Sequence, residues 1–414
     1  MKIAIVSSLF PPYAIGGAEQ VAAQLAGALD RLGHQVDVIS TCARSQLGGQ
    51  SYSSEIREGI RIWRVAPRNL YWSYDKQREQ PGRLARAGWH ALDLWNPSVI
   101  VPLRKVLDQI RPDVVNTHNI DGFSPAVWQV ARRYTPAIAH TLHDYHLLCP
   151  RAVMQRRDGT MCENLCRFCS VYAQYHRRFQ KHVRMLISPS MATAELHRRA
   201  GWTEPRIEII RNGVDVEPVP RPEPAASHPL RVLFLSRLER EKGCESLLAA
   251  IPAFAGSSEI EFHVAGSGTL DSSFLELAEW VPNMTWHGFV RGRRKDELFS
   301  RCDVFVQLSE CRENAPLSII EAKAHGLYLV GTAVGGIPEL IENSAAGQLI
   351  PPADPRKLQA LLETLCGSRA EIRRGRAARS ERSAVHGTRQ MAEAYVEAFR
   401  SLSTAITNEA TSHG

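Results

Sequence analysis

Two acidic residues, Glu313 and Glu321, stand eight positions apart in the stretch ECRENAPLSIIEAKAHG. One face of a helix repeats every three, four or seven positions, so this spacing does not place both acids on one face. Pro316, between them, suits the start of a helix, and Gly326 suits its end. The stretch therefore predicts a loop that carries Glu313 and a helix over residues 316–325 that carries Glu321.

The start of this predicted helix is suited to binding an anion. Free backbone N–H groups and the helix dipole make a helix N-terminus a site for phosphate. Glu321 lies about 7.5 Å along the helix axis, at 1.5 Å per residue, and helical side chains lean back towards the N-terminus. The two acids can therefore lie on either side of a bound phosphate. Taken alone, they are better explained as two solvated surface charges.

Other motifs in the same half supply what a diphosphate needs. SRLEREKG, residues 236–243, follows an apolar strand and contributes Arg237 and Lys242. Cations at the end of a strand neutralise phosphate oxygens. AGSG, residues 265–268, ends another strand and permits close backbone approach, and the Gly-Gly turn of GGIPELI, residues 335–341, precedes a further helix. Together these motifs favour a binding site over scattered surface charges.

The elements that must position these residues alternate between strands and helices. KIAIVSS, the helix AEQVAAQLAGALDRLG and HQVDVIS form a βαβ unit, which predicts a parallel sheet. Further strands are expected within residues 112–118, 136–144 and 185–190, and a second βαβ series begins at residue 231. Ligands of such sheets gather beyond the carboxyl ends of the strands. The fold class is therefore α/β, with two doubly wound sheets in tandem.

The chain of 414 residues is too long for one ordinary core. Residues 216–230 contain five prolines and no periodic apolar face, which is typical of a linker. We therefore expect a first domain over residues 1–215 and a second over residues 231–387. Residues 388–414 are expected to form a C-terminal helix, which packs back on the first domain, and a tail.

The motifs SRLEREKG, AGSG, HGFV, SECRENAPLSIIEAKAHG and GGIPELI stand in the order and at the spacing of the retaining glycosyltransferases of family 4. PPYAIGGAE, PDVVNTH and RNGVD in the first half agree, so the resemblance covers nearly the whole chain. It implies the GT-B architecture, in which two Rossmann-like domains face a central cleft. It also implies a retaining, metal-independent hexosyltransferase. Such an enzyme moves a sugar from a UDP- or GDP-linked donor to a lipid-linked saccharide or growing glycan, in surface polysaccharide or glycolipid synthesis.

The resemblance implies roles for individual residues. Glu321 would hold the ribose hydroxyls and Glu313 the hydroxyls of the donor sugar. Arg237 and Lys242 would neutralise the leaving diphosphate, and His118 would touch the reacting sugar. The other donor-site residues implied are Gly16, Gly17, Gly266, Gly268, Val290, Asn314, Ala315 and Leu317. The chain has Asn-Ala-Pro after Glu313 where many relatives have a glycine-containing turn, which leaves the donor sugar open.

Two further clusters in the first half keep more than one interpretation. His143 and Asp144 end a strand, where they either bind the acceptor and take its proton or satisfy strand-end backbone groups. Four cysteines lie within 21 residues, in the pattern C-x12-C-x3-C-x2-C. They either form a structural zinc site or a redox-sensitive cluster, or they are four reduced thiols; catalysis itself is expected to need no cofactor. The cysteines are Cys149, Cys162, Cys166 and Cys169.

The excess positive charge lies in the first half of the chain. Residues 1–220 hold 28 Lys and Arg against 19 Asp and Glu, whereas residues 221–414 hold 22 against 24. Aromatic and basic residues alternate within residues 61–95, which suits an anionic membrane surface. A nucleic-acid surface and a buried aromatic cluster are the alternatives, and no nucleic-acid partner is expected. The residues concerned are Trp63, Trp72, Trp89, Trp95, Tyr71, Tyr74, Arg64, Arg68, Arg78, Arg83 and Arg86.

Other classes of protein are less consistent with the sequence. No apolar run approaches the roughly 18 residues of a membrane span, and Pro11-Pro12 favours a first strand over a signal peptide. We therefore expect a cytoplasmic protein, associated with the inner face of the plasma membrane. A non-catalytic sugar-nucleotide binder and a GT-B epimerase remain as rivals. A dinucleotide oxidoreductase is disfavoured, because the first βα loop lacks G-x-G-x-x-G.

Overall fold

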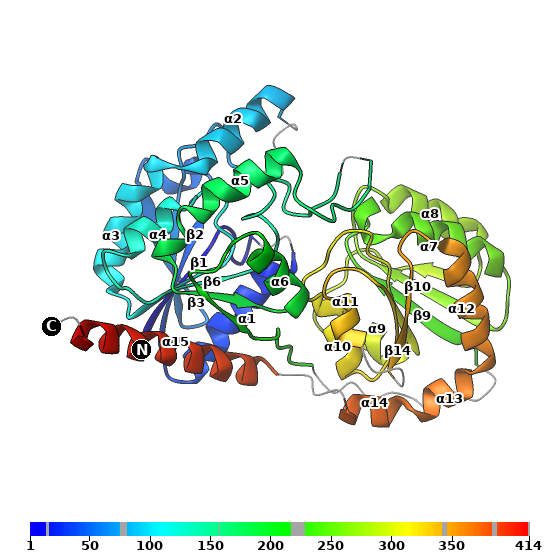
Figure 1. Ribbon diagram of the computed structural model, residues 1–414. Coiled ribbons are helices and arrows are strands. Elements are labelled where there is room, and N and C mark those ends of the chain that lie inside the picture. The colour runs from blue at the N-terminus through cyan, green and yellow to red at the C-terminus, as the bar shows by residue number, and fades with distance from the viewer. Residues whose placement is uncertain are drawn as a thin grey trace. The chain divides into compact units, whose positions relative to one another are not determined.

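Each half of the chain folds around its own parallel sheet, as the computed structural model shows (Figure 1). The structure describes residues 1–13, 16–74, 81–156, 158–216, 228–341, 346–382 and 387–412. The described residues group into two units. Unit 1 comprises Met1–Ala152, Asn164–Gly213 and His386–Gly414, and unit 2 comprises Val153–Glu163 and Val214–Val385.

Unit 1 contains an eight-stranded sheet with the order β3-β4-β2-β1-β5-β6-β7-β8. All neighbouring strands are parallel except the antiparallel pair β3 and β4. The apolar residues of the first strand are almost fully buried, as expected of a strand covered on both faces. The strands are β1 (Lys2–Ser7), β2 (Gln35–Thr41), β3 (Tyr52–Arg57), β4 (Ile60–Val65), β5 (Val114–Thr117), β6 (Ile138–Thr141), β7 (Met185–Ser188) and β8 (Arg206–Ile209).

The helices of unit 1 include the last helix of the chain, which contacts the first (Figure 1). Tyr395 is 1% exposed and its hydroxyl lies 3.3 Å from Oγ1 of Thr141, at the end of a central strand. The backbone N–H of Gly213 donates to the sulfur of Met391. The C-terminal helix is therefore part of the core of unit 1. The helices are α1 (Gly17–Arg31), α2 (Arg83–Leu94), α3 (Ile100–Ile110), α4 (Ala126–Ala131), α5 (Arg167–Arg177), α6 (Met191–Arg199) and α15 (Thr388–Ser412).

Unit 2 contains a six-stranded, wholly parallel sheet with the order β11-β10-β9-β12-β13-β14. The strands are β9 (Leu230–Leu235), β10 (Ile260–Ala265), β11 (Met284–Trp286), β12 (Val304–Gln307), β13 (Tyr328–Thr332) and β14 (Gly347–Ile350). The helices are α7 (Cys244–Ala250), α8 (Asp271–Trp280), α9 (Arg293–Arg301), α10 (Leu317–Ala324), α11 (Ile337–Ile341), α12 (Pro355–Gly367), α13 (Arg369–Arg374) and α14 (Arg376–Arg382). Short 3-10 helices are η1 (Arg44–Leu47), η2 (Pro97–Val99), η3 (Gln180–His182), η4 (Arg240–Lys242) and η5 (Ile251–Phe254).

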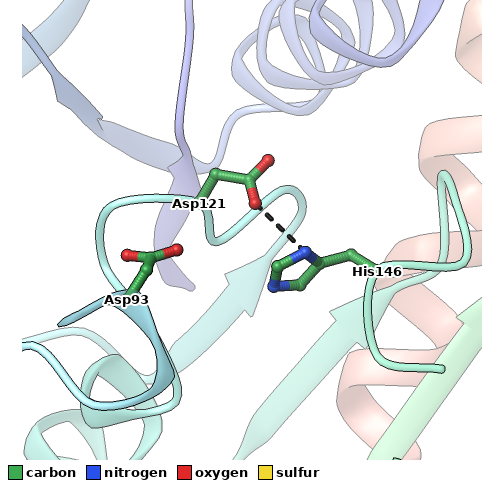
Figure 2. Close-up of side chains that lie close together, drawn as sticks. All are labelled: Asp93, Asp121 and His146. Carbon is green, nitrogen blue, oxygen red and sulfur yellow. Dashed lines mark ion pairs between the residues drawn. The ribbon is translucent and has the colours of Figure 1, made fainter. Parts of the chain in front are cut away.

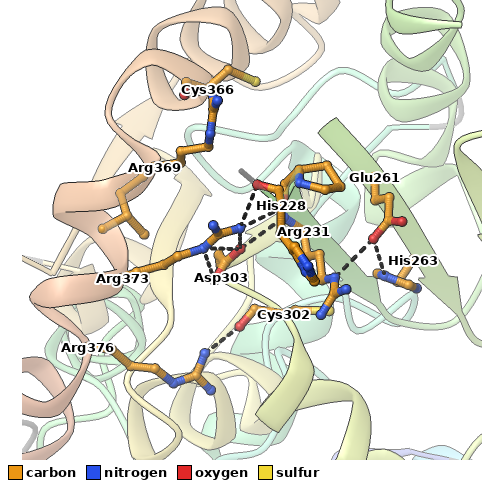
Figure 3. A network of polar contacts seen from close by, with 12 residues as sticks. His228, Arg231, Glu261, His263, Cys302, Asp303, Cys366, Arg369, Arg373 and Arg376 are labelled. Carbon is orange, nitrogen blue, oxygen red and sulfur yellow. Dashed lines mark hydrogen bonds and ion pairs between the residues drawn. The ribbon is translucent and has the colours of Figure 1, made fainter. Parts of the chain in front are cut away.

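A polar network fastens α13 and α14 to the amino ends of the unit 2 strands (Figure 3). The guanidinium of Arg373 pairs with Asp303 at 3.0 Å, and the Asp303 side chain is fully buried. Asp303 also accepts from the backbone N–H of Arg231, while Arg373 donates to the carbonyl of Pro229. Arg376 donates to carbonyl oxygens that precede β12, one of them that of Phe299. The helices α13 and α14 therefore pack at the amino ends of the strands. The loops that could bind a ligand lie at the opposite, carboxyl ends.

The doubly wound α/β fold predicted from the sequence is confirmed. One segment groups differently from the predicted boundaries. Residues 153–163 belong to unit 2, because Gln155 donates to the carbonyl of Glu310 and Arg312 donates to the carbonyl of Cys162. Most of the predicted linker, residues 217–227, lies outside the described residues.

Two smaller points concern the helices. The predicted helix over residues 316–325 is α10, which begins one residue later, because Pro316 is its N-cap with an extended ψ of 123°. Among the described residues, no helix combines the length and the apolar composition that crossing a membrane requires.

Candidate functional site

The strand order of unit 2 reverses between β9 and β12, where a crevice for ligands is expected in an open parallel sheet. The loop after β9 carries Lys242 in η4, and the loop after β12 carries Glu313. The two side chains form an ion pair, and each is only 15% exposed. The predicted cation and the predicted loop acid therefore meet, although they are 71 positions apart in the chain.

A series of hydrogen bonds orients Glu313. The Ser318 hydroxyl donates to Oε1 of Gln307 at 3.0 Å, and Nε2 of Gln307 donates to Oγ of Ser309 at 2.8 Å. The Ser309 hydroxyl in turn donates to Oε1 of Glu313 at 2.8 Å. Because Gln307 ends β12 and Ser318 opens α10, the strand and the helix together fix the carboxylate.

Both members of the ion pair are held in their charged forms. Burial by itself would raise the pKa of Glu313, but the ammonium of Lys242 and the Ser309 hydrogen bond bring it below its usual value. Burial opposes the charge of Lys242, yet Glu313 raises the pKa of that ammonium above its usual value. A buried charge is stable only when it is paired in this way. The pair is a fixed dipole at the switch point of the sheet.

Arg237, the second predicted cation, stands further out in the same loop. Its guanidinium is about half exposed and pairs with Glu241 at 3.1 Å, not with Glu313. Its charge is nevertheless among the weaker causes that lower the pKa of Glu313. Arg237 is therefore near the pair and accessible to an anion.

Glu321 is buried on α10, where the predicted spacing puts it, and is 7% exposed. It forms an ion pair with Lys295, on the first turn of α9. Burial raises the pKa of Glu321, and the charge of Lys295 opposes that rise. The sequence analysis missed Lys295; the basic run RGRRK, residues 291–295, was the available signal.

Glycines allow the loops of this site to approach one another. A Cβ on Gly266, whose φ is +141°, would lie 1.8 Å from the carbonyl oxygen of Ser236. A Cβ on Gly335, whose φ is +57°, would lie 2.2 Å from the carbonyl oxygen of Glu313. The N–H of Gly336 donates to that same oxygen at 2.7 Å. The Gly-Gly turn therefore supports the backbone of Glu313 directly.

The remaining predicted donor-site residues of unit 2 are mostly buried around these loops. Gly268 is packed against the β9 loop, where a Cβ would lie 2.4 Å from the carbonyl oxygen of Leu238. Four others are less than a tenth exposed. They are Val290, Asn314, Ala315 and Leu317.

In unit 1 the predicted glycines open α1. Gly16 is the N-cap and Gly17 the first helical residue, and the N–H of Gly16 donates to Oε2 of Glu19 at 2.8 Å. The other carboxylate oxygen of Glu19 accepts from the side-chain amide of Asn119, at 3.5 Å, in the loop after β5. The order of this sheet reverses between β1 and β5. The two loops at this second switch point are thus linked by Glu19, which sequence reasoning missed.

His118 and His143 form a close pair at the carboxyl ends of β5 and β6. Nδ1 of His118 lies 2.6 Å from Nε2 of His143, and the rings stack with centroids 4.9 Å apart. Burial, with lesser contributions from His143 and His140, lowers the pKa of His118 well below its usual value, and burial lowers that of His143 to about 4. Both imidazoles are therefore neutral at physiological pH. Nε2 of His118 is buried and has no hydrogen-bond partner.

The predicted acceptor residues line a small cavity of unit 1. Burial raises the pKa of Asp144 to about 6, although the nearby His146 acts against the rise. Oδ1 of Asp144 accepts from the backbone N–H of His146 at 2.7 Å. The residues that line this cavity are His118, Asn119, Ile120, Asp121, His140, Thr141, His143, Asp144 and His146.

The four cysteines are divided between the units. Cys166 caps α5, and its sulfur accepts from the backbone N–H of Cys169 at 3.4 Å. Cys149 is buried in unit 1, whereas Cys162 belongs to unit 2. A side-chain hydrogen bond also links Cys169 to Cys149. In the part of the chain that the structure describes, another group of three metal-ligating side chains has its ligand atoms all within 4.8 Å of one another. It consists of Asp93, Asp121 and His146 (Figure 2).

Two of the six aromatic residues of the basic segment are buried. Trp63 and Trp89 are buried, and the indole of Trp63 donates to Asp37 at 2.9 Å. Trp72 donates to the hydroxyl of Thr41. Arg78 lies outside the described residues. Trp95, by contrast, is 39% exposed, so only part of this segment matches the alternative of a buried aromatic cluster.

Comparison with known proteins gives matches over most of the chain. The family described as Glycosyltransferase Family 4 matches residues 15–218, and the family described as Glycosyl transferases group 1 matches residues 229–368. An uncharacterised 42.6 kDa protein in the cps region of Klebsiella pneumoniae is 26% identical, covering 82% of this chain and 87% of that protein. The amylovoran biosynthesis glycosyltransferase AmsK of Erwinia amylovora is 28% identical over 42% of this chain and 45% of its own length.

Solved structures share the fold at low sequence identity. Sucrose-phosphate synthase from Thermosynechococcus elongatus superimposes with a TM-score of 0.70 at 18% identity, covering 98% of this chain and all of that one. Anabaena HepE, solved in complex with UDP and glucose, gives a TM-score of 0.65 at 18% identity, covering 97% of this chain and all of that one.

Proposed function

The chain belongs to the glycosyltransferases of group 1 and family 4, and from that membership we propose that it moves a sugar from a nucleotide-diphosphate donor to an acceptor, with retention of configuration. The observation that carries the proposal is the largely buried Lys242–Glu313 pair at the switch point of unit 2. The pair sets a cation and a carboxylate side by side. The cation suits the diphosphate of a nucleotide sugar, and the carboxylate suits the hydroxyls of its sugar.

The reaction breaks the bond between the anomeric carbon and the diphosphate oxygen. Positive charge builds on the sugar and negative charge on the leaving diphosphate. Lys242, the accessible Arg237 and the N-terminus of α10 stabilise that negative charge without having to reorganise. No D-x-D motif is available to hold a metal ion for this purpose. We therefore propose metal-independent transfer.

We assign the two acids, Glu313 and Glu321, to different parts of the donor. Glu321 holds the ribose hydroxyls, with Lys295 keeping its carboxylate ionised. Glu313 accepts hydrogen bonds from the sugar hydroxyls, and Lys242 faces the phosphate. We assign Glu313 no role as a nucleophile.

In unit 1, we assign His118 to the reacting sugar. Its neutral imidazole and its buried, unpartnered Nε2 suit a hydrogen bond with a sugar hydroxyl. His143 orients it from the other side through the contact between the two rings. Asp144, whose pKa burial raises to about 6, is the residue we assign to accept the proton of the acceptor hydroxyl.

The donor is UDP- or GDP-linked, and the acceptor a lipid-linked saccharide or growing glycan in polysaccharide synthesis. AmsK, named for amylovoran biosynthesis, supports the pathway, and HepE with bound UDP supports a uridine donor. A panel of nucleotide sugars tests this choice by thermal shift. A ligand at 100 times its Kd stabilises the folded state by about 2.7 kcal/mol.

Turnover then separates a catalyst from its rivals. A transferase releases nucleoside diphosphate faster when an acceptor is present. A non-catalytic binder shows the thermal shift but no release, and an epimerase converts the donor to its epimer with the diphosphate intact. Either of those two outcomes would refute the proposed transfer.

Contact with an anionic membrane is a second part of the proposal, supported by side chains exposed on two helices of unit 1. Leu84 on α2 is 90% exposed beside Arg83, and Phe168 on α5 is 71% exposed beside Arg167. Apolar side chains flanked by arginines suit the headgroup region of such a membrane. Flotation with phosphatidylglycerol vesicles at low salt should recover the wild type. Phe168→Ser should bind the vesicles less than Leu275→Ser, a control variant in unit 2. If the wild type does not bind the vesicles, the proposed membrane contact is refuted.

A further inference from the structure

Three potential metal ligands from distant parts of the sequence meet in unit 1 (Figure 2). Asp93 lies in the last turn of α2, Asp121 in the loop after β5 and His146 in the loop after β6. One ligand atom from each lies within 4.8 Å of the other two. The carboxyl ends of neighbouring parallel strands bring the last two together, and α2 adds the third.

Asp93 has an oxygen that lacks a partner. Its side chain is buried, with the residue only 4% exposed. Oδ1 accepts from the backbone N–H of Gly122 at 2.8 Å, but Oδ2 is buried with no hydrogen-bond partner. A buried carboxylate oxygen without a donor is costly, and such an oxygen usually has a ligand. Figure 2 shows the Asp93 carboxylate directed towards Asp121 and His146.

The spacing of the other two ligands suits a shared ion. Nδ1 of His146 lies 3.1 Å from Oδ1 of Asp121. Two ligands of one metal, each bound at about 2.0–2.1 Å, stand roughly 3.0–3.4 Å apart. The second oxygen of Asp121 accepts from the hydroxyl of Tyr74 at 3.3 Å, an outer contact of the kind that orients a ligating carboxylate.

The local charge also favours a cation. Asp144 stands next to this group through its hydrogen bond to the backbone of His146. Within the described residues, neither Asp93, Asp121 nor Asp144 forms an ion pair with a lysine or arginine. Three carboxylates are therefore balanced by one imidazole.

We propose that Asp93, Asp121 and His146 bind a divalent transition-metal ion through two carboxylate oxygens and one imidazole nitrogen. This ligand set suits Zn²⁺ and its neighbours in the first transition row. Three protein ligands leave a position open, and Asp121 and His146 also line the small cavity of unit 1. None of the three ligands has been assigned a role in sugar transfer, although Asp121 and His146 line the same cavity as His118 and Asp144.

The test measures metal binding to the full chain in the absence of any nucleotide sugar. Protein treated with EDTA and then freed of it is titrated with Zn²⁺ by calorimetry, and bound metal is counted by mass spectrometry after gel filtration. The wild type should bind one equivalent at this site. Asp93→Asn keeps an oxygen for the Gly122 N–H but removes the charge, and should weaken binding at least tenfold. Asp108→Asn, an exposed carboxylate change on α3, should leave binding unchanged.

Cobalt separates this site from the cysteines. Co²⁺ bound by oxygen and nitrogen shows visible d–d bands without the near-ultraviolet charge-transfer band that thiolates produce. The combined variant Cys149→Ser, Cys166→Ser and Cys169→Ser should keep the metal. His146→Gln provides a second ligand change, and circular dichroism checks that both ligand variants fold. Absence of binding, undiminished binding in both ligand variants, or loss of the metal in the cysteine variant would overturn the proposal.

Discussion

The Lys242–Glu313 pair concentrates the proposed chemistry in two side chains. Each was predicted from its own motif, but the sequence does not say that they contact one another. Because they follow adjacent strands of a parallel sheet, their loops meet. The pairing matters, since it holds Glu313 ionised within a buried site.

Glu313→Gln tests this pair at the level of a single charge. The amide keeps the size of the side chain but leaves the buried Lys242 without its counter-ion. We expect transfer to fall by at least about 10²-fold, the scale of losing one preorganised electrostatic group, while the thermal shift with nucleotide largely remains. Steady-state kinetics measures the first and a melting curve the second. Glu245→Gln, on the exposed start of α7, is the control, and full transfer by Glu313→Gln would refute the assignment.

Lys295 and Glu321 form a second ion pair. A double-mutant cycle can separate its contribution to stability from the role of Glu321 in nucleotide binding. Lys295→Met alone leaves a buried carboxylate unpaired, which should cost about 3–5 kcal/mol of unfolding free energy. Adding Glu321→Gln should recover most of that stability, because no buried charge then remains. Nucleotide affinity should stay low in the double variant, since the ribose contact is lost. Urea denaturation and the nucleotide thermal shift measure the two effects; restored nucleotide binding in the double variant would exclude Glu321 from the ribose site.

At the scale of elements, the Gly-Gly turn before α11 is what supports the Glu313 loop. Gly335→Ala should lose on the order of 1–3 kcal/mol from its positive φ, and more from the contact of its Cβ with the Glu313 carbonyl. Transfer activity should fall together with stability, because the Glu313 carbonyl must move to make room for the new Cβ and the loop moves with it. Gly367→Ala, near the end of α12, is a matched control, since its Cβ meets nothing within 4 Å. Thermal melts and transfer rates check both variants, and equal behaviour would show that the turn does not position the loop.

The sequence predicts an element well when the residues that mark its ends stand next to it in the chain. The helix that carries Glu321 could be placed to within a residue at each end, because Pro316 and Gly326 stand beside it. The segment 153–163 could not be assigned, because its partner Arg312 lies 150 positions away from Cys162. The same holds for Asp93, which reaches Asp121 and His146 only after a sheet and two loops have formed. Periodicity reports single elements, whereas these groupings depend on tertiary contacts.

For the whole molecule, buried histidines predict how stability depends on pH. Burial lowers the pKa of His197, His263 and His325 to about 4 each. In the unfolded chain an imidazole binds a proton near pH 6.5. Between these values the unfolded chain binds more protons, so unfolding free energy is greatest above pH 6.5 and falls as the pH drops towards 4. The combined loss should be on the order of a few kcal/mol.

Urea denaturation at pH 7.5, 6 and 5 measures this loss, with EDTA present so that bound metal does not contribute. His197→Gln, in the core of unit 1, should reduce the slope with pH. His228→Gln changes an exposed side chain and should leave the slope as it is. Stability that stays constant from pH 7.5 to 5 would contradict the prediction.

The passage of the chain between its units bears on how this protein can be recombined with its relatives. The backbone changes unit after residues 152, 163, 213 and 385. A chimera joined only within the linker would therefore inherit the segment 153–163 and α15 from the wrong parent. The loop that carries Glu313 would then contact a 153–163 segment from the other parent, and the core around Tyr395 would contain a helix from the other parent. Exchanging donor specificity between homologues consequently requires four coordinated crossovers, with residues 153–163 taken from the parent of the second half and α15 from the parent of the first.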